Sequence, residues 1–346
     1  MSIFRVALSG DFNKPDGSPA YPMFDLSPLE NAADVELAYV DPIDGRMTAA
    51  SLADFDALIL LTPIFDADSI PQDGRLSVVA RFGVGYDTVD VDACTKSGIG
   101  VCITPDGVRR PVAVTIMTFV LALAGRLFDK DRLTREGPAG FAKRSDYMGM
   151  GLVGRTLGSI GIGNIGAEAF RMAAPFEMRH IAHDPFCNPA TAAEIGVELV
   201  DLETVFAESD FLCVNTPLTE ETRHIVNAKS LALMKPAAYL INTSRGPTVD
   251  QAALLAALTD GTIAGAGLDV LDPEPPSVDD PILKLDNVIL TPHALCWTDQ
   301  CFAGIGASDV EQVLMIKNGQ VPPHLVDKGV AASSAFQARL KAYAAV

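Results

Sequence analysis

A glycine-rich turn near the middle of the chain constrains the fold more than any other feature. Residues 156–166 read Thr-Leu-Gly-Ser-Ile-Gly-Ile-Gly-Asn-Ile-Gly, so Gly161, Gly163 and Gly166 form a G-x-G-x-x-G pattern behind an apolar run. This order of strand, tight turn and helix lets a backbone approach a pyrophosphate at a helix N-terminus. Glycine-rich turns also occur where chains merely pack closely, so the surrounding sequence has to decide between the two interpretations.

An acid follows the turn at the distance that a dinucleotide site requires. The run Arg179-His-Ile-Ala-His-Asp184 is strand-like and ends in a carboxylate that can accept hydrogen bonds from both adenosine ribose hydroxyls. The same carboxylate would repel a 2′-phosphate, so the sequence predicts NAD rather than NADP as the cofactor. The alternative is that Asp184 and Pro185 only form a turn at a strand end.

The length of 346 residues predicts two domains, each with a core of its own. Short apolar runs alternate with helix-compatible stretches in both halves, which is the rhythm of a parallel sheet flanked by helices. The junction is expected near Pro105, and residues 298–319 are expected to form a helix that returns to the first domain, followed by a turn and a short polar end. Strands are expected at 4–8, 35–40, 57–61, 76–81, 100–103, 158–162, 180–183, 211–215, 239–242, 266–270 and 288–291.

Composition excludes several classes of partner. The chain has 26 basic and 44 acidic residues and a net charge of −18, which argues against nucleic acid or an anionic membrane surface. Six cysteines without a C-x-x-C pair, a strand-like N-terminus and a longest apolar run of only residues 112–124 indicate a cytoplasmic protein without a membrane span. The five histidines form no ligand-like cluster, so no metal site is expected.

Three segments outside the strand pattern also carry expectations. Residues 11–28 are rich in Pro, Gly and Asp and predict an irregular surface excursion. The apolar helix that follows Arg109-Arg110-Pro111 is expected to be buried, either inside one subunit or between two. The polar residues 132–150 predict an extended arm, for which subunit contact is a reasonable guess.

Three phrases downstream carry the polar groups that chemistry would need. They are Ile241-Asn-Thr-Ser-Arg-Gly246, Gly267-Leu-Asp-Val-Leu-Asp-Pro-Glu-Pro-Pro276 and Leu290-Thr-Pro-His-Ala294, and each follows a strand-like run. Ligands bind open α/β sheets at the carboxyl ends of the strands, so the three phrases are expected to converge on one crevice.

The side chains in these phrases form a coherent set. Arg245 can polarise a carbonyl and hold a carboxylate, His293 can deliver a proton, and Glu274 can orient that histidine and raise its pKa. Together they suffice to reduce a 2-keto acid. Taken singly, each residue also has a purely structural interpretation: His293 as a loop histidine, Arg245 as part of a surface turn and Glu274 as a solvated acid.

The ordered motifs resemble those of the D-isomer-specific 2-hydroxyacid dehydrogenase family. They comprise Gly158-x-x-Gly-x-Gly-x-x-Gly166, Asp184, Asn215-Thr-Pro-Leu-Thr-x-x-Thr222, Asn242-Thr-Ser-Arg-Gly246, Asp269 with Glu274-Pro275, and Thr291-Pro-His293. The resemblance begins at Arg81-Phe-Gly-Val-Gly-Tyr-Asp87 and covers nearly the whole chain. It implies an α/β fold of two doubly wound parallel-sheet domains, in which a Rossmann NAD domain (105–296) is inserted into a flavodoxin-like substrate domain (1–104 and 297–346).

The resemblance also assigns roles to individual residues. Arg245, Glu274 and His293 match the catalytic residues, and the backbone N–H groups of Val84 and Gly85 match those that hold the substrate carboxylate. The residues expected at the cofactor are Gly161, Gly163, Asn164, Ile165, Gly166, Asp184, Thr216, Pro217, Thr243 and Asp269, the last near the nicotinamide carboxamide. The family further implies a homodimer and a small D-2-hydroxy acid or 2-keto acid as substrate.

Departures from the family pattern leave the identity of the substrate open. Arg109 and Arg110 stand where substrate side groups could be read, and Trp297 replaces a small residue after the histidine. The arginine pair either marks a second anionic group on the substrate or is a helix-leading pair that is exposed to solvent or salt-bridged across the dimer. A different class of function, an NAD(H)-sensing corepressor-like binding protein without turnover, shares this fold.

Overall fold

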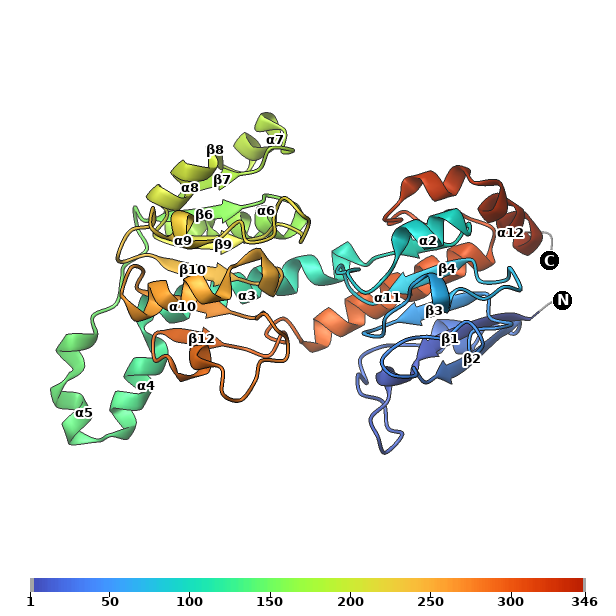
Figure 1. Ribbon diagram of the computed structural model, residues 1–346, viewed down its shortest axis with the longest axis horizontal. Coiled ribbons are helices and arrows are strands. Elements are labelled where there is room, and N and C mark those ends of the chain that lie inside the picture. The colour runs from blue at the N-terminus through green and yellow to red at the C-terminus, as the bar shows by residue number, and fades with distance from the viewer. Residues whose placement is uncertain (1–2, 345–346) are drawn as a thin grey trace. The chain divides into compact units, whose positions relative to one another are not determined.

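The structure is a computed structural model that describes residues 3–344 and consists of two compact units (Figure 1). The first unit comprises Met1–Val108 and Trp297–Val346, and the second comprises Arg109–Cys296. Each unit is built around one parallel sheet. The chain passes from the first unit to the second within helix α3 (Pro105–Gly125), a few residues after the expected junction.

The sheet of the first unit has five parallel strands in the order β2-β1-β3-β4-β5. This is the flavodoxin-like order, and it confirms the predicted fold class of this unit. The strand β3 is buried along its whole length, as the central strand of a sheet covered on both faces should be. The strands are β1 (Phe4–Ser9), β2 (Val35–Val40), β3 (Ala57–Leu60), β4 (Val78–Arg81) and β5 (Gly100–Cys102).

The sheet of the second unit has seven parallel strands in the order β12-β11-β10-β9-β6-β7-β8. Counted within the unit, this is the Rossmann order extended by one strand, so the predicted class is confirmed here too. The strands are β6 (Thr156–Ile160), β7 (Arg179–His183), β8 (Glu198–Leu199), β9 (Phe211–Val214), β10 (Tyr239–Asn242), β11 (Gly265–Leu268) and β12 (Val288–Leu290). The two-residue β8 was not expected from sequence.

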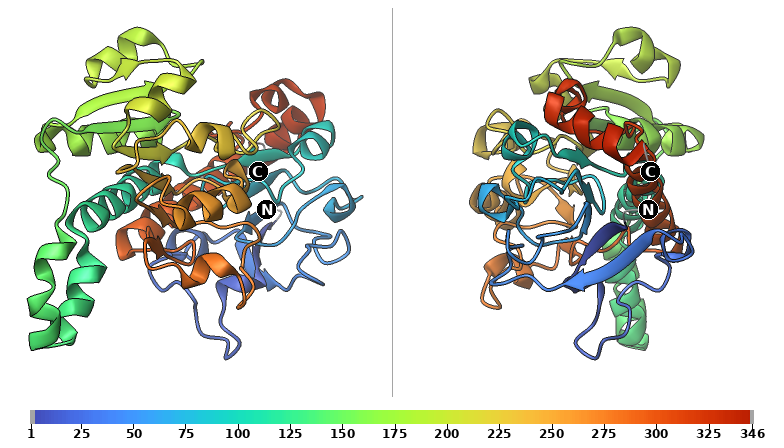
Figure 2. Two further views of the ribbon diagram at one scale, coloured as in Figure 1. Left: turned by 60° about the vertical axis from the view of Figure 1, so that its left-hand side comes forward. Right: turned by 90° about the vertical axis from the view of Figure 1, so that its right-hand side faces the viewer.

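Helices cover both faces of this second sheet (Figures 1 and 2). One core cluster joins the strands to α8 (Leu202–Glu208), α9 (Ala228–Leu231) and α10 (Gln251–Thr259). The opposite cluster joins them to α3, α6 (Asn164–Ala173) and α7 (Pro189–Glu194). Such double coverage explains why the strands read as nearly continuous apolar runs.

Helix α3 is part of the core of the second unit. Ile116, Phe119 and Val120 are buried in it, and a Cβ atom on Gly267 of β11 would lie 2.6 Å from the Phe119 ring. Among the described helices α3 alone is long and apolar enough to cross a membrane, yet 61% of that window is buried within the protein. The expectation of a buried helix is therefore confirmed, with burial inside one chain.

Residues 132–150 are not the extended arm that the sequence predicted. Helix α4 (Leu127–Arg135), helix α5 (Pro138–Ala142) and a 3₁₀ turn (Arg144–Tyr147) occupy this region. The prediction was wrong because these helices have hardly any apolar face: Leu133 and Gly140 are their only buried residues. Without apolar periodicity, exposed helices are difficult to distinguish from loops.

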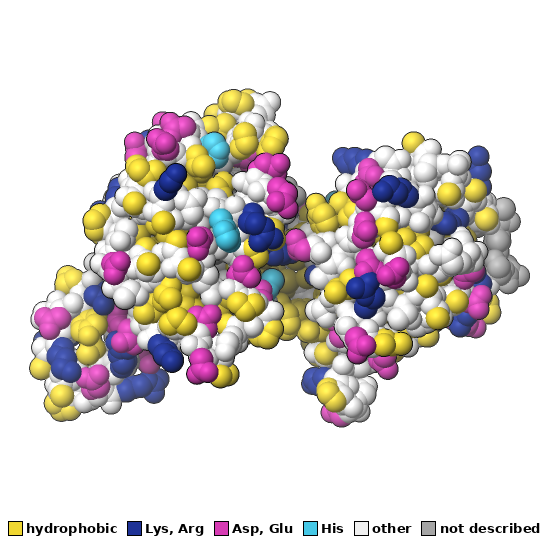
Figure 3. All heavy atoms as spheres, viewed as in Figure 1, with side chains coloured by type: hydrophobic (Ala, Val, Ile, Leu, Met, Phe, Trp, Pro, Cys, Tyr) yellow, Lys and Arg dark blue, Asp and Glu magenta, His cyan; other side chains and the backbone are white. Residues whose placement is uncertain are grey.

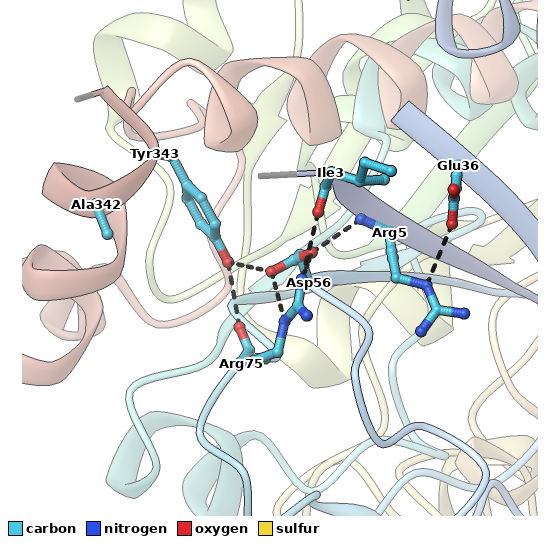
Figure 4. A pocket seen from close by; sticks show the side chains of 7 residues that line it. All are labelled: Ile3, Arg5, Glu36, Asp56, Arg75, Ala342 and Tyr343. Atoms are coloured by element: carbon cyan, nitrogen blue, oxygen red, sulfur yellow. Dashed lines mark hydrogen bonds and ion pairs between the residues drawn. The ribbon is translucent and has the colours of Figure 1, made fainter. Parts of the chain in front are cut away.

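The two ends of the chain meet in the first unit (Figure 4). The expected returning helix is α11 (Asp299–Lys317), and the expected polar end is instead the helix α12 (Ser334–Ala344). Asp56 is 3% exposed and accepts hydrogen bonds from Arg75 Nη2 at 2.6 Å and Tyr343 Oη at 3.1 Å. These bonds join α12 to the strands, and α1 (Ser27–Glu30) and α2 (Val91–Lys96) complete the unit.

Candidate active site

The glycine turn lies between β6 and α6, and its backbone leaves no room for side chains on one side. Gly161 has φ of +91°, and a Cβ atom there would lie 2.8 Å from the carbonyl oxygen of Asn215. A Cβ atom on Gly166 would lie 2.8 Å from the carbonyl oxygen of Gly161. β6 also begins and ends two residues earlier than predicted, because the positive φ of Gly161 terminates it.

Gly163, in contrast to Gly161 and Gly166, has open space beside it. A Cβ atom on it would meet nothing within 4 Å, and within the described chain no side chain caps the start of α6. The first N–H groups of this helix, at Asn164, Ile165 and Gly166, have no acceptor within the helix, and the positive end of the helix dipole lies behind them. The turn fits a dinucleotide pyrophosphate: it is open where the ligand would approach and closed where the protein packs.

Asp184 stands beside this turn at the end of β7. One carboxylate oxygen accepts the N–H of Ile162 at 2.9 Å, and the other accepts the N–H of Phe186 at 2.9 Å. The two bonds fix the plane of the carboxylate while each oxygen keeps a further lone pair. The geometry suits the predicted ribose contact.

Arg245 follows β10 on a loop that hydrogen bonds hold in shape. Its carbonyl oxygen accepts bonds from Asn242 Nδ2 at 2.9 Å and from Thr248 Oγ1 at 2.6 Å. A Cβ atom on Gly246 would lie 1.8 Å from the carbonyl oxygen of Leu271, so only glycine permits this loop to touch the next one. The contact brings the arginine loop against the segment that carries Glu274.

Asp269 organises the third loop. It is 4% exposed, and its Oδ1 accepts bonds from the Thr291 hydroxyl at 2.6 Å and from the N–H groups of Ala294 and Leu295 at 3.1 and 3.2 Å. One buried carboxylate oxygen therefore holds both sides of the histidine loop. Sequence reasoning placed Asp269 near the carboxamide but missed this anchoring role.

His293 and Glu274 are in direct contact. His293 Nδ1 lies 2.9 Å from Glu274 Oε1, and the two side chains are 44% and 37% exposed. An ionised glutamate accepts a proton-bearing Nδ1, which leaves Nε2 as the nitrogen that can exchange a proton with a ligand. The histidine backbone is left-handed, with φ of +54°, an unusual conformation of the kind that concentrates at functional sites.

The remaining predicted cofactor residues lie at the same edge of the second sheet. Thr216 and Pro217 follow β9, and Thr243 follows β10. All strands of this sheet are parallel, so the ends of β6, β7, β9, β10, β11 and β12 carry the glycine turn, Asp184, the 216–217 segment, Arg245, Asp269 and His293 along one edge. Apart from Arg109, which lies at the start of α3, the structure brings to this edge the predicted residues that belong to the second unit.

Three of the predicted substrate residues belong to the first unit. Val84 and Gly85 are half-buried in the loop after β4, which is held by a bond from Gly83 N to Thr104 Oγ1 at 3.0 Å and by one from Thr104 N to Gly83 O at 2.9 Å. Trp297 is 50% exposed just before α11.

The arginine pair at the start of α3 has partners. Arg110 Nη1 lies 2.6 Å from Glu168 Oε1 on α6, and this hydrogen bond lowers the pKa of Glu168 despite its partial burial. Arg109 is exposed on the neighbouring position and also interacts with the protein. Arg110 is therefore paired within its own unit, whereas the salt-bridge alternative expected a partner across the dimer.

Two positioning residues escaped sequence reasoning. Asn242 binds the backbone of the arginine loop through its amide and also accepts the N–H of Ser244 at 3.0 Å. Gln251 Oε1 accepts the N–H of Asp272 at 2.9 Å and so secures the segment before Glu274. Asn242 could have been predicted from the sequence, since it directly follows an apolar run. Nothing in the sequence around Gln251 indicates its positioning role.

A parallel sheet with a glycine turn, a fixed acid at the end of β7 and an acid-supported histidine at one edge is the arrangement expected of an NAD-binding dehydrogenase. Comparison with known sequences agrees. A sequence model described as "D-isomer specific 2-hydroxyacid dehydrogenase, NAD binding domain" matches residues 117–294. The chain belongs to the D-isomer-specific 2-hydroxyacid dehydrogenase family, and the resemblance found in its motifs is confirmed.

Individual relatives agree with this assignment. The glyoxylate reductase of Korarchaeum cryptofilum is 40% identical over 308 residues, which are 88% of this chain and 93% of that protein. The D-3-phosphoglycerate dehydrogenase of Archaeoglobus fulgidus is 37% identical over 254 residues, which are 73% of this chain and 48% of that protein. The crystal structure of a glyoxylate reductase from Paecilomyes thermophila has a TM-score of 0.81 at 26% identity and covers 95% of this chain and 100% of that one.

The protein is therefore an NAD-dependent oxidoreductase that interconverts a 2-hydroxy acid and its 2-keto acid. The relatives named above carry the names of enzymes, and nothing in these comparisons supports the alternative of an NAD-sensing protein without turnover.

Proposed function

We propose that the chain acts on a small D-2-hydroxy acid and its 2-keto form, with His293 and Glu274 as the acid–base pair and Arg245 orienting the substrate. Bound NADH would supply the hydride in reduction, and bound NAD⁺ would accept it in oxidation. The 2.9 Å contact between His293 Nδ1 and Glu274 Oε1 carries the proposal. In reduction, Nε2 of the histidine gives its proton to the substrate oxygen while Glu274 stabilises the charge on the ring, and in oxidation it takes that proton back.

The cofactor and substrate would divide between the two units. We assign the second unit to NAD, through the glycine turn, Asp184, the 216–217 segment, Thr243 and Asp269. The first unit would hold the substrate carboxylate with the N–H groups of Val84 and Gly85. Backbone donors suit a chain of net charge −18, because they bind an anion without adding a cation.

Replacing His293 by alanine tests this mechanism. The variant should lower kcat for glyoxylate or pyruvate by about 10²- to 10⁴-fold, the usual contribution of a positioned acid–base group. His224→Ala is a matched control, since His224 lies in the same unit, is exposed and also has a left-handed backbone, with φ of +52°. The dissociation constant for NADH and the Tm should stay near those of the wild type in both variants. Near-normal turnover by His293→Ala would refute the assigned role.

A homodimer in the cytoplasm is proposed as the working state. Phe128, Phe141 and Met148 on the α4–α5 region are 60%, 55% and 77% exposed, and Figure 3 shows hydrophobic side chains among the charged ones there. Exposed apolar clusters of this kind favour subunit contact. Sedimentation velocity should give about twice the mass of one chain, and Phe128→Asp with Phe141→Asp should yield monomers. A wild-type monomer would contradict the proposal.

A further inference from the structure

Six aromatic rings of the first unit form one cluster, here called the aromatic cluster. Tyr21 stacks on Phe302 with ring centroids 4.3 Å apart and planes 10° apart, and Trp297 meets the edges of both at 5.6 and 5.3 Å. Phe82 lies 5.1 Å from Phe12 and 5.6 Å from Phe302. Phe24 completes the set, at 5.2 Å from Phe12 and 5.0 Å from Phe82.

The cluster explains residues 11–28, which the sequence predicted to be a surface excursion. Phe12 is only 3% exposed, and Asp11 accepts a bond from the N–H of Thr62 at 3.0 Å. A Cβ atom on Gly306 of α11 would lie 2.4 Å from the ring of Phe24. Phe12, Asp11 and Phe24 thus anchor a segment that otherwise stays irregular and largely exposed, as predicted.

The cluster adjoins the loop proposed to hold the substrate carboxylate. Phe82 directly precedes Gly83 and the N–H groups of Val84 and Gly85, and it is 4% exposed among the other rings. Trp297 is 50% exposed, so one side of this ring is available to a ligand.

The electrostatics of the cluster favour an uncharged ligand group. Burial raises the pKa of Tyr21, and the negative charge of the nearby Asp11 raises it further. The same negative charge of Asp11 would repel a second anionic group on a ligand. Arg110 already pairs with Glu168 in the second unit. Glyoxylate carries only a hydrogen atom at the position of a side chain and would leave the rings without contact.

We propose that the aromatic cluster, with Trp297 as its exposed member, selects 2-keto acids that carry a large apolar or aromatic side chain. This inference rests on the proposed function of the same site. Trp297 is a specificity-determining residue in this proposal: it contacts the side chain of the substrate and not the reacting atoms. An added apolar group in a matching pocket contributes about 10- to 200-fold in kcat/KM per methylene-sized unit.

The test is a comparison of kcat/KM for glyoxylate, pyruvate and phenylpyruvate with NADH. The wild type should prefer phenylpyruvate to glyoxylate by at least about tenfold. Trp297→Ala should lower kcat/KM for phenylpyruvate at least ten times more than that for glyoxylate, mainly through KM, and Trp297→Phe should recover part of the loss. Tyr39→Ala is the control, since Tyr39 is 46% exposed in the same unit but lies on β2, outside the cluster.

Three results would overturn the inference, and they are distinguishable. A wild-type preference for glyoxylate, or an equal loss on both substrates in Trp297→Ala, would refute the selectivity while leaving the proposed reaction intact. A Tm of Trp297→Ala well below that of Tyr39→Ala would show that the ring serves packing instead. Failure of the wild type to consume NADH with all three keto acids would refute the proposed function itself.

Discussion

The two sheets of this chain are both parallel, yet their carboxyl edges are built differently. The edge of the seven-stranded sheet consists of glycines that permit close backbone approach, together with fixed polar side chains such as Asp184, Asp269 and His293. Beside the end of β4 in the five-stranded sheet lie a half-buried loop and six aromatic rings. The polar edge suits a fixed chemistry on a fixed cofactor, and the aromatic one suits selection among substrates.

The sharpest test of the polar edge compares two glycines of one turn. Gly161→Ala should lower the Tm by several degrees and abolish NADH binding, because its φ is +91° and its Cβ would lie 2.8 Å from a carbonyl oxygen. Gly163→Ala should leave the Tm within about 1 °C, since its Cβ meets nothing within 4 Å, but raise the Kd for NADH by roughly tenfold. Calorimetry and fluorescence titration measure both.

Two outcomes would contradict this account of the turn. Unchanged NADH affinity in Gly163→Ala would mean that the open side of the turn does not face the cofactor. A stable Gly161→Ala protein would mean that the close packing against Asn215 is not required.

Local sequence patterns predicted the polar edge well. The apolar runs placed eleven strands within two residues of their observed bounds, and the glycine spacing identified the turn, because both depend on residues adjacent in the chain. Asp269 and Gln251 were harder, because their partners lie about 20 to 26 residues away and no local rule links them.

Almost nothing in the sequence predicted the aromatic edge, that is, the six rings beside the end of β4. Phe12, Phe82 and Trp297 come from three distant segments, so their meeting depends on the topology of the whole unit. The Pro- and Gly-rich composition of residues 11–28 was a correct indication of irregular surface backbone but gave no sign that Phe12 is buried. Composition predicts whether a segment is regular, while burial is decided by what the fold places beside it.

The smallest predicted effect concerns a buried acid beneath the aromatic edge. Asp309 of α11 is fully buried, and neither of its oxygens has a hydrogen-bond partner within the described chain. Burial raises its pKa well above the usual value, only partly offset by the positive charge of Arg81 from β4. The buried thiol of Cys102 from β5 lies near enough for Asp309 to raise its pKa further.

The sign of the effect follows from linkage. In the unfolded chain an aspartate carboxyl titrates at about 3.9. Above that pH the folded state keeps the proton on Asp309 while the unfolded state loses it. The free energy of unfolding therefore falls as the pH rises from the unfolded pKa toward the folded pKa. Asp309→Asn removes this loss and should raise the Tm by a few degrees at pH 8, with a smaller gain at pH 5 where the wild-type acid is nearer neutrality. Asp299→Asn, an exposed acid at the start of the same helix, should show no such trend. A lower Tm for Asp309→Asn at pH 8 would mean that an ionised Asp309 stabilises the fold through Arg81, and that the aromatic edge, like the polar one, depends on a fixed charge.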